Sequence, residues 1–156
     1  MKKYLLMRQF LIFFVTMIVS SVVFSSCFIF KKKGNLPSGF IQTTEVGWST
    51  IQIRGDVTFE KAFEEVLDVV AKRFEMDVIS KEGAYARSQW SYRWGAIEGS
   101  SYRTRVTFKF SPDKTKVDLK TEAEWAVGNR WLVGYDTRLL ETIKQDIMGV
   151  VGRTVM

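Results

Sequence analysis

The chain has 156 residues, which is room for a single domain. Its single cysteine, Cys27, excludes an intrachain disulfide, and the absence of histidine excludes histidine-activated nucleophiles and most zinc sites. Six of the 23 basic residues precede Gly34 and no acid precedes Glu45, so the rest of the chain has 17 basic and 17 acidic residues, a neutral balance that argues against nucleic-acid binding. We therefore expect a protein that is not an enzyme and that binds no cofactor, metal or nucleic acid.

The first distinct segment is an uncharged apolar run at residues 10–30, with basic residues on both sides. Within it, Phe24, Ser25 and Ser26 stand directly before Cys27; a basic start, an apolar stretch and small residues are the parts of a secretory signal. This pattern resembles the lipobox of bacterial lipoprotein precursors, with Phe24 where that family usually has leucine. The resemblance implies that residues 1–26 are a signal peptide and that Cys27 becomes the acylated N-terminus. It also implies a protein anchored by lipid in the cell membrane or outer membrane, with its domain facing the periplasm or the exterior.

The same run also fits an uncleaved transmembrane helix over residues 10–30. Twenty-one helical residues rise about 31 Å, enough to cross a hydrocarbon core of about 30 Å. A buried core helix is a third reading, but so long a run without polar residues is rare in a small soluble domain. Either of the first two readings attaches the chain to a membrane. Lys31, Lys32 and Lys33 would then lie near the headgroups, each contributing about 1 kcal/mol at an anionic surface. The alternative for these three lysines is an ordinary solvated run of charges.

The residues after the apolar run indicate a tether and then a folded domain. We assign residues 27–45 to the lipidated cysteine and a tether, because GNLPSGFIQTTE at 34–45 combines proline, glycines and small polar residues. The globular domain is expected at 46–156, beginning near Val46. Loose alternation after Val46 predicts a short strand, and Thr58 fits the N-cap of an amphipathic helix that ends near Phe74. The chain that follows reads as extended, with a break or bulge near Gly83.

The strongest local signal is a pair of runs, 102–110 and 116–125, in which apolar and polar residues alternate around the turn sequence SPDK. These runs predict an antiparallel hairpin with one buried and one solvated face. The register follows from apolar pairs that face the core: Phe110–Val117, Phe108–Leu119 and Tyr102–Trp125. It also places opposite charges across the outer face: Lys109–Asp118, Arg105–Glu122 and Arg103–Glu124. We therefore expect the basic side chains to be paired, and not to form a free anion-binding stripe.

The last part of the chain predicts a second helix. Residues 126–135 read as a loop or irregular strand, after which Asp136 caps a helix whose apolar face includes Leu140, Ile143 and Ile147. The expected order is β-α-β-β-β-α. We predict an α+β domain in which two helices pack on one face of an antiparallel sheet of four or so strands.

This order is similar to that of the small α/β modules of the BamC (NlpB) outer-membrane lipoproteins. The similarity is carried by the helix from Phe59 to Phe74, by EGAYARSQW at 82–90 and by YRTRVTF at 102–108. Those proteins carry two such modules, whereas this chain shows one. The resemblance implies a noncatalytic, periplasm-facing envelope protein that works by contact.

The leading functional hypothesis is an envelope lipoprotein that acts through protein contacts, as a scaffold or accessory subunit of an envelope protein partner. The alternative is a module that binds a glycan or lipid with exposed aromatic side chains, because the chain has five tryptophans. We expect Trp90 and Trp125 in the core, and we expect Trp94 and Trp131, beside glycine-containing loops, at the contact surface. A ligand site would need a concave pocket, whereas a protein-contact face would be flatter and would expose apolar area.

Overall fold

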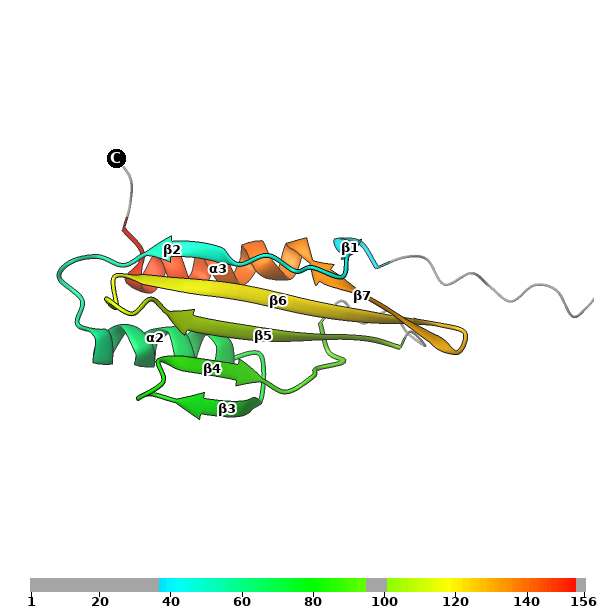
Figure 1. Ribbon diagram of the computed structural model, residues 1–156, viewed down its shortest axis with the longest axis horizontal. Helices are drawn as coiled ribbons and strands as arrows, with labels where there is room; N and C mark the ends of the chain where they lie inside the picture. The colour runs from blue at the N-terminus through cyan, green and yellow to red at the C-terminus, as the bar shows by residue number, and fades with distance from the viewer. Residues whose placement is uncertain (1–36, 95–100, 154–156) are drawn as a thin grey trace, which may run out of the picture. The chain divides into compact units, whose positions relative to one another are not determined.

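The computed structural model describes residues 37–94 and 101–153 (Figure 1). The predicted signal peptide or membrane anchor and Cys27 lie outside the described residues. The described part of the chain forms seven strands and two helices. In chain order these are β1 (Phe40–Gln42), β2 (Ser49–Gln52), α2 (Phe59–Ala71), β3 (Met76–Ser80), β4 (Tyr85–Ser88), β5 (Tyr102–Phe110), β6 (Lys116–Val127), β7 (Arg130–Asp136) and α3 (Thr137–Val151).

All seven strands belong to one antiparallel sheet with the order β1-β7-β6-β5-β4-β3, and β2 also pairs with β6. Strand β5 lies along one edge of β6, whereas β2 and β7 pair with opposite ends of its other edge. The α+β class is therefore confirmed. The predicted strand number and order were wrong, because the sheet has seven strands instead of about four and the order is β-β-α-β-β-β-β-β-α.

Two of the additional strands follow tight turns. Residues 76–88, expected as extended chain with a break or bulge near Gly83, form a hairpin of β3 and β4 whose turn includes a φ of 51° at Ala84. Strand β6 turns into β7 through Gly128 and Asn129, with a φ of 61° at Gly128. Glycine at the first position of a two-residue turn is typical of type II′ hairpins. The stretch expected as a loop or irregular strand therefore contains the strand β7, which continues the sheet.

Strand β1 lies in the stretch expected to be a tether, so the sheet begins before Val46. It pairs with β7, with Phe40 opposite Asp136 and Ile41 opposite Tyr135. The two backbones approach so closely at Gly134 that a Cβ there would overlap the carbonyl oxygen of Ile41. Only glycine fits this position without displacing β1.

The β5–β6 hairpin has the predicted register at all six expected pairs, from Phe110–Val117 to Arg103–Glu124. Its turn is held by Asp113, which accepts hydrogen bonds from the hydroxyls of Ser111 and Thr115 at 2.6 Å and 2.9 Å. These bonds lower the pKa of Asp113 to about 2. The alternation of residue types along these two strands was therefore sufficient to predict their pairing.

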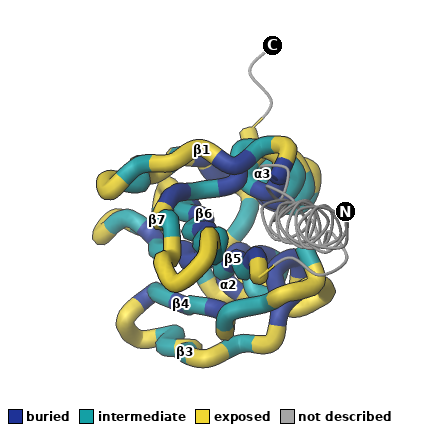
Figure 2. Tube along the Cα trace, turned by 90° about the vertical axis from the view of Figure 1, so that its right-hand side faces the viewer, coloured by how far each residue is buried: buried dark blue, intermediate teal, exposed yellow. Residues whose placement is uncertain are grey.

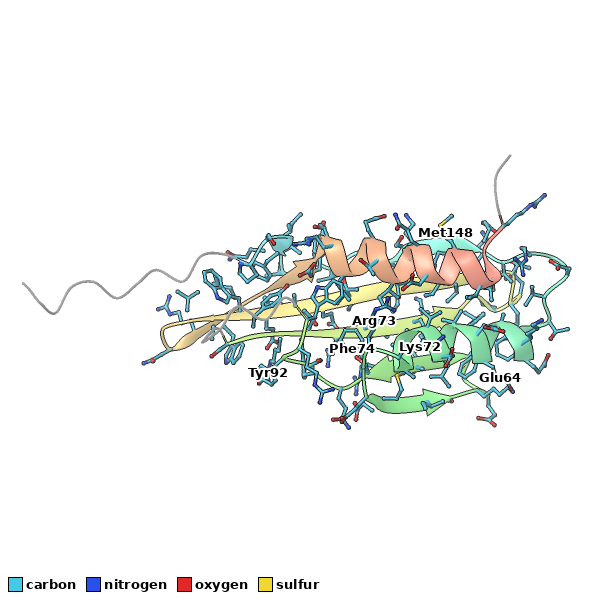
Figure 3. All side chains as sticks on the ribbon, turned by 180° about the vertical axis from the view of Figure 1, so that it is seen from behind. Glu64, Lys72, Arg73, Phe74, Tyr92 and Met148 are labelled. Carbon is cyan, nitrogen blue, oxygen red and sulfur yellow. The ribbon has the colours of Figure 1, made fainter. Side chains whose placement is uncertain are left out.

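The two helices lie side by side on one face of the sheet (Figures 1 and 3). Both predicted caps are confirmed: Thr58 accepts from the backbone N–H of Lys61 at 3.4 Å, and Asp136 accepts from that of Leu139 at 2.9 Å. Buried residues of both helices pack against buried residues of the sheet, and Figure 2 marks buried positions in dark blue. The main core includes Ile51, Phe63, Val66, Val70, Val106, Phe108, Leu119, Leu139, Ile143 and Ile147.

A smaller core cluster lies beneath β1. It consists of Phe40, Tyr102 and Ala123, with Trp125 among the partly buried side chains packed against it. Tyr102 donates its hydroxyl proton to Oδ2 of Asp136 at 2.7 Å. Burial raises the pKa of Tyr102, and the hydrogen bond to Asp136 raises it further. Both residues are almost fully buried, so this pair joins the sheet to the start of α3 and is closed to solvent.

Candidate contact surface

The face of the sheet opposite the helices carries two of the predicted charge pairs. Arg103 on β5 donates to Oε2 of Glu124 on β6 through both Nε and Nη2, at 2.8 Å and 2.6 Å. Arg105 donates through Nε to Oε2 of Glu122 at 2.6 Å. Both expected pairs are therefore formed across the outer face of the sheet.

Three tryptophan rings stack on the basic side chains of this face. Trp90 lies beside both arginines, with its ring centroid 4.8 Å from Cζ of Arg103 and 4.5 Å from that of Arg105. Trp131 on β7 also contacts Arg103, at 4.5 Å. Such cation–π contacts contribute about 0.5–1 kcal/mol at exposed sites. Arg103 is thus held by two indole rings and one carboxylate.

The third ring belongs to Trp48, which precedes β2. Its centroid lies 4.3 Å from Nζ of Lys109 and 5.6 Å from Nζ of Lys120. Lys109 lies opposite Asp118 in the predicted register, but the structure describes no ion pair between them; Asp118 accepts from the hydroxyl of Thr50 at 2.6 Å. The expected third charge pair is therefore replaced by a lysine–indole contact.

We call this surface the aromatic–cation face; its members are Trp48, Trp90, Trp131, Arg103, Arg105, Lys109 and Lys120. Burial alone would lower the pKa of Arg103, but the hydrogen bonds of Glu124 and Tyr92 reverse this effect and raise it. Burial would likewise raise the pKa of Glu122, but Arg105 and Lys120 lower it on balance. Both shifts stabilise the charged forms. The face therefore keeps a constant charge pattern at neutral pH.

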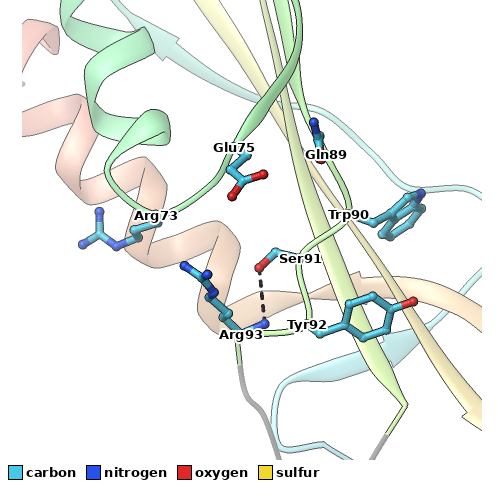
Figure 4. Close-up of a pocket in the computed structure, with 7 residues that line it drawn as sticks. All are labelled: Arg73, Glu75, Gln89, Trp90, Ser91, Tyr92 and Arg93. Carbon is cyan, nitrogen blue, oxygen red and sulfur yellow. Dashed lines mark hydrogen bonds between the residues drawn. The ribbon is translucent and has the colours of Figure 1, made fainter.

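A small pocket lies next to this face, between the end of α2 and residues 89–93 (Figure 4). Its volume is about 230 Å³, below the roughly 300–1,000 Å³ typical of ligand sites. Its lining includes Arg73, Glu75, Trp90, Tyr92 and Arg93, and Figure 4 shows the rings of Trp90 and Tyr92 pointing away from Arg73. The exposed rings of Trp48 and Trp131 are not among the lining residues, and so small a hollow does not suit a glycan or lipid headgroup.

The predicted contact residues have different surroundings. Trp131 is 42% exposed and belongs to the aromatic–cation face, whereas Trp94 is half-buried and packs against both core clusters. Trp125 packs against the smaller core cluster as expected. The prediction for Trp90 was wrong, because its ring lies on the outer face between two arginines. Ser91 bridges to the inward-facing Thr104, so the neighbouring Trp90 must point outward.

Sequence reasoning assigned no position to Trp48, which is 40% exposed on the outer face. A signal was present, because Trp48 alternates with Thr50, and Thr50 pairs with the outward-facing Asp118. Within residues 37–94 and 101–153, no group of three or more acidic, cysteine or histidine side chains could hold a metal ion. Neither α2 nor α3, the helices of this part of the chain, is long and apolar enough to cross a membrane.

The comparisons with known proteins do not place the chain in a family. A scan against protein-family models gave no match, and a search of curated proteins gave no significant one.

Proposed function

We propose that this protein is a membrane-anchored, noncatalytic lipoprotein of the bacterial cell envelope. In this proposal its domain binds a partner protein through the aromatic–cation face and acts as a scaffold or accessory subunit. The membrane anchor is the acylated Cys27 or, in the alternative form, an uncleaved helix over residues 10–30.

The observation that carries the proposed protein contact is the face of the sheet that neither α2 nor α3 covers. Trp48 and Trp131 each expose two-fifths of their surface there, while ion pairs and stacking hold the side chains around them in place. Tryptophan and arginine are the residues most enriched at binding hot spots, and a preorganised surface loses little side-chain entropy on binding. This arrangement supports a partner with a complementary flat surface.

The surroundings of the face favour a protein over a small ligand. The adjacent pocket is small and contains none of the exposed indole rings, and the buried Tyr102–Asp136 pair is closed to solvent. A glycan- or lipid-binding module is the second candidate, because the free sides of Trp48 and Trp131 could stack on a sugar ring.

Photo-crosslinking in intact cells tests the proposal. A photoreactive residue at position 48 should yield adducts of one defined protein mass, because this position lies in the proposed contact. The matched control is position 64 on α2, where Glu64 is exposed in the helical layer (Figure 3). Equal protein adducts at positions 48 and 64 would contradict the proposed face, and glycan adducts at position 48 would favour the second candidate.

Intact-mass analysis of the membrane-extracted protein tests the anchor separately. A chain that begins at Cys27 and carries acyl groups is expected. An unmodified full-length chain in the membrane would favour the transmembrane helix instead.

A further inference from the structure

Apolar side chains form a strip on the outer face of the sheet, where β1 pairs with β7. Val133 on β7 lies opposite the outward-facing Glu124, and Trp131 is two residues away on the same strand. Ile41 on β1 pairs with Tyr135, so it lies diagonally next to Val133 on the same side of the sheet. Ile41, Trp131 and Val133 are 44%, 42% and 45% exposed. We call these three residues the apolar strip.

A group of lysines lies on the same face, toward the other end of β6. Lys109, Lys116 and Lys120 alternate with the core-facing residues of β5 and β6, so all three point to the outer face. We call them the lysine group. Two of them, Lys109 and Lys120, lie beside the ring of Trp48. β2 pairs with β6 at this end, whereas β7 pairs with its opposite end (Figure 1).

The lysine group has more positive charge than its surroundings neutralise. Six basic strand residues and four acidic ones point to the outer face: Arg87, Arg103, Arg105, Lys109, Lys116 and Lys120 against Asp77, Asp118, Glu122 and Glu124. Arginines pair with three of these acids, and one of the three also pairs with Lys120. Lys109 and Lys116 form no ion pair among the described residues. Counting Glu45, in the loop that leads to Trp48, still leaves six basic residues against five acidic ones.

We propose that the partner of the aromatic–cation face is a protein segment with apolar side chains at one end and carboxylates at the other. The apolar side chains cover the apolar strip, and the carboxylates contact the lysine group. This inference rests on the proposed function and adds the chemistry of the partner.

The distance between the two groups favours a macromolecule over a small ligand. Glu124 lies opposite Val133 and Asp118 lies opposite Lys109, and these two acids are six residues apart on β6. An antiparallel strand rises about 3.4 Å per residue, so the apolar strip and the lysine group are about 20 Å apart. A partner helix of about 14 residues, or an extended segment of about six, covers this distance. One sugar ring or lipid headgroup does not.

The residues between the two groups need no charge from the partner. Arg103 is paired with Glu124, and Arg105 is paired with Glu122. A partner carboxylate placed here would meet an acid that already occupies the arginine, and like charges in contact disfavour binding. The complementary acids of the partner are therefore expected at the lysine group, and its apolar residues at the apolar strip.

Carbodiimide coupling in isolated membranes tests the expected carboxylates. The reagent joins a lysine Nζ to a carboxylate in contact with it and adds no spacer. We expect amides between the lysine group and the protein that forms the adduct at position 48. Exposed Lys61 on α2 is the matched control and should give at most about a fifth of that yield. An absence of partner amides at the lysine group, or equal yields at Lys61, would overturn the inference.

Substitution of Val133 tests the apolar end of the contact. Val133→Ser should lower the adduct yield at position 48 about fivefold, because it removes apolar surface that the partner covers. Val133→Ile keeps the apolar character and should keep the yield. Met148→Ser is the matched control, because Met148 is 42% exposed on α3, and it should leave the yield unchanged (Figure 3). A yield that is unchanged in Val133→Ser would overturn the contact at the apolar strip.

Charge reversal at Lys116 tests the other end. Lys116→Glu should also lower the adduct yield at position 48 about fivefold, since it replaces an attraction to the partner by a repulsion. Lys116→Arg should keep the yield, and Lys61→Glu on α2 is the control for a change of net charge. Equal yields in Lys116→Glu and Lys61→Glu would show that the partner presents no carboxylates here.

The adduct at position 48 separates this inference from the proposed function. One defined protein adduct whose yield is insensitive to Val133→Ser and Lys116→Glu leaves the protein contact standing and overturns the partner chemistry. The lack of any defined protein adduct at position 48 overturns both.

Discussion

The β5–β6 hairpin and the β1–β7 pair show two different ways in which strand register is determined. The hairpin joins long neighbouring strands in which apolar residues alternate toward the core from Tyr102 to Phe110 and from Val117 to Trp125, and in which two pairs of outer charges are complementary. β1 contributes only three residues and pairs with a strand near the other end of the chain, at a point where Gly134 leaves room for its backbone. Register is thus encoded by a repeated local pattern in one region and by the shape of a distant backbone in the other.

This difference has a consequence for stability. The hairpin contributes its inner face to the main core, so damage there should weaken the whole domain. β1 covers the smaller cluster around Tyr102, so damage there should open one edge of the sheet and leave the rest folded. The following experiments test this contrast, in order of decreasing expected effect.

The largest effect is expected at Phe108 on the buried side of the hairpin. Phe108 is fully buried, and its ring centroid lies 5.7 Å from that of Phe63 on α2. Phe108→Ala should reduce the free energy of unfolding by about 3–5 kcal/mol because it leaves a cavity in the main core. Urea titration of the full chain in detergent measures this loss. Phe108→Leu is the control and should cost less than about 2 kcal/mol; equal losses would show that Phe108 does not pack in the core.

A smaller and more local effect is expected at Gly134. Gly134→Ala should separate β1 from β7 and cost about 1–3 kcal/mol. The amide of Thr43, which donates to the carbonyl of Val133 at 3.1 Å, should lose protection from hydrogen exchange while the β5–β6 amides keep theirs. Gly47→Ala is the matched control, because a Cβ at Gly47 meets no atom within 4 Å. Protection of Thr43 that persists in Gly134→Ala would mean that the close approach is not required.

The outer charge pairs should add a pH-dependent contribution to the hairpin. The folded-state pKa of Glu122 lies below its ordinary value of 4.5, because Arg105 and Lys120 outweigh the effect of burial. The Arg105–Glu122 ion pair therefore stabilises the fold above about pH 4.5, and this contribution is lost as the pH falls through the lowered pKa of Glu122.

We expect Glu122→Gln to remove up to about 1 kcal/mol at pH 7 and to flatten the acid side of the stability profile. Unfolding measured between pH 3 and pH 7 checks this, with Glu82→Gln in an exposed turn as the control. Identical acid slopes for the wild type and Glu122→Gln would contradict the prediction.

The smallest effect is expected at the hairpin turn. The pKa of Asp113 is about 2 because the hydroxyls of Ser111 and Thr115 and the backbone N–H of Thr115 donate to its carboxylate. Its contribution is present above the ordinary value of 3.8 and lost as the pH falls toward 2. Asp113→Asn should therefore lower Tm at pH 6 but not at pH 2. An NMR titration should show a higher pKa for Asp113 in the Ser111→Ala variant. The pKa of Asp113 should be unchanged in the control variant Asp56→Asn.

The candidate contact surface could be predicted only in part. The pairs Arg103–Glu124 and Arg105–Glu122 follow from alternation, and these residues do lie opposite each other. The positions of the indole rings that stack on the arginines could not be predicted from alternation. Trp90 follows β4 and Trp131 lies on β7, and the side of the sheet to which each ring points depends on how those segments pair with β5 and β6. Trp94, expected at the surface, is held by contacts from both core clusters.

The amino-acid sequence by itself determined the α+β class, both helix caps and the complete register of the β5–β6 hairpin. These features depend on side chains that are near neighbours along the chain, where helical spacing, strand alternation and capping act directly. Only the tertiary structure decided that β1 joins the sheet, that the sheet has seven strands and that three indole rings lie over the basic side chains of its outer face. The reason is physical: these contacts join segments far apart in the chain, and the space that each segment leaves for the other is defined only once the whole sheet has formed.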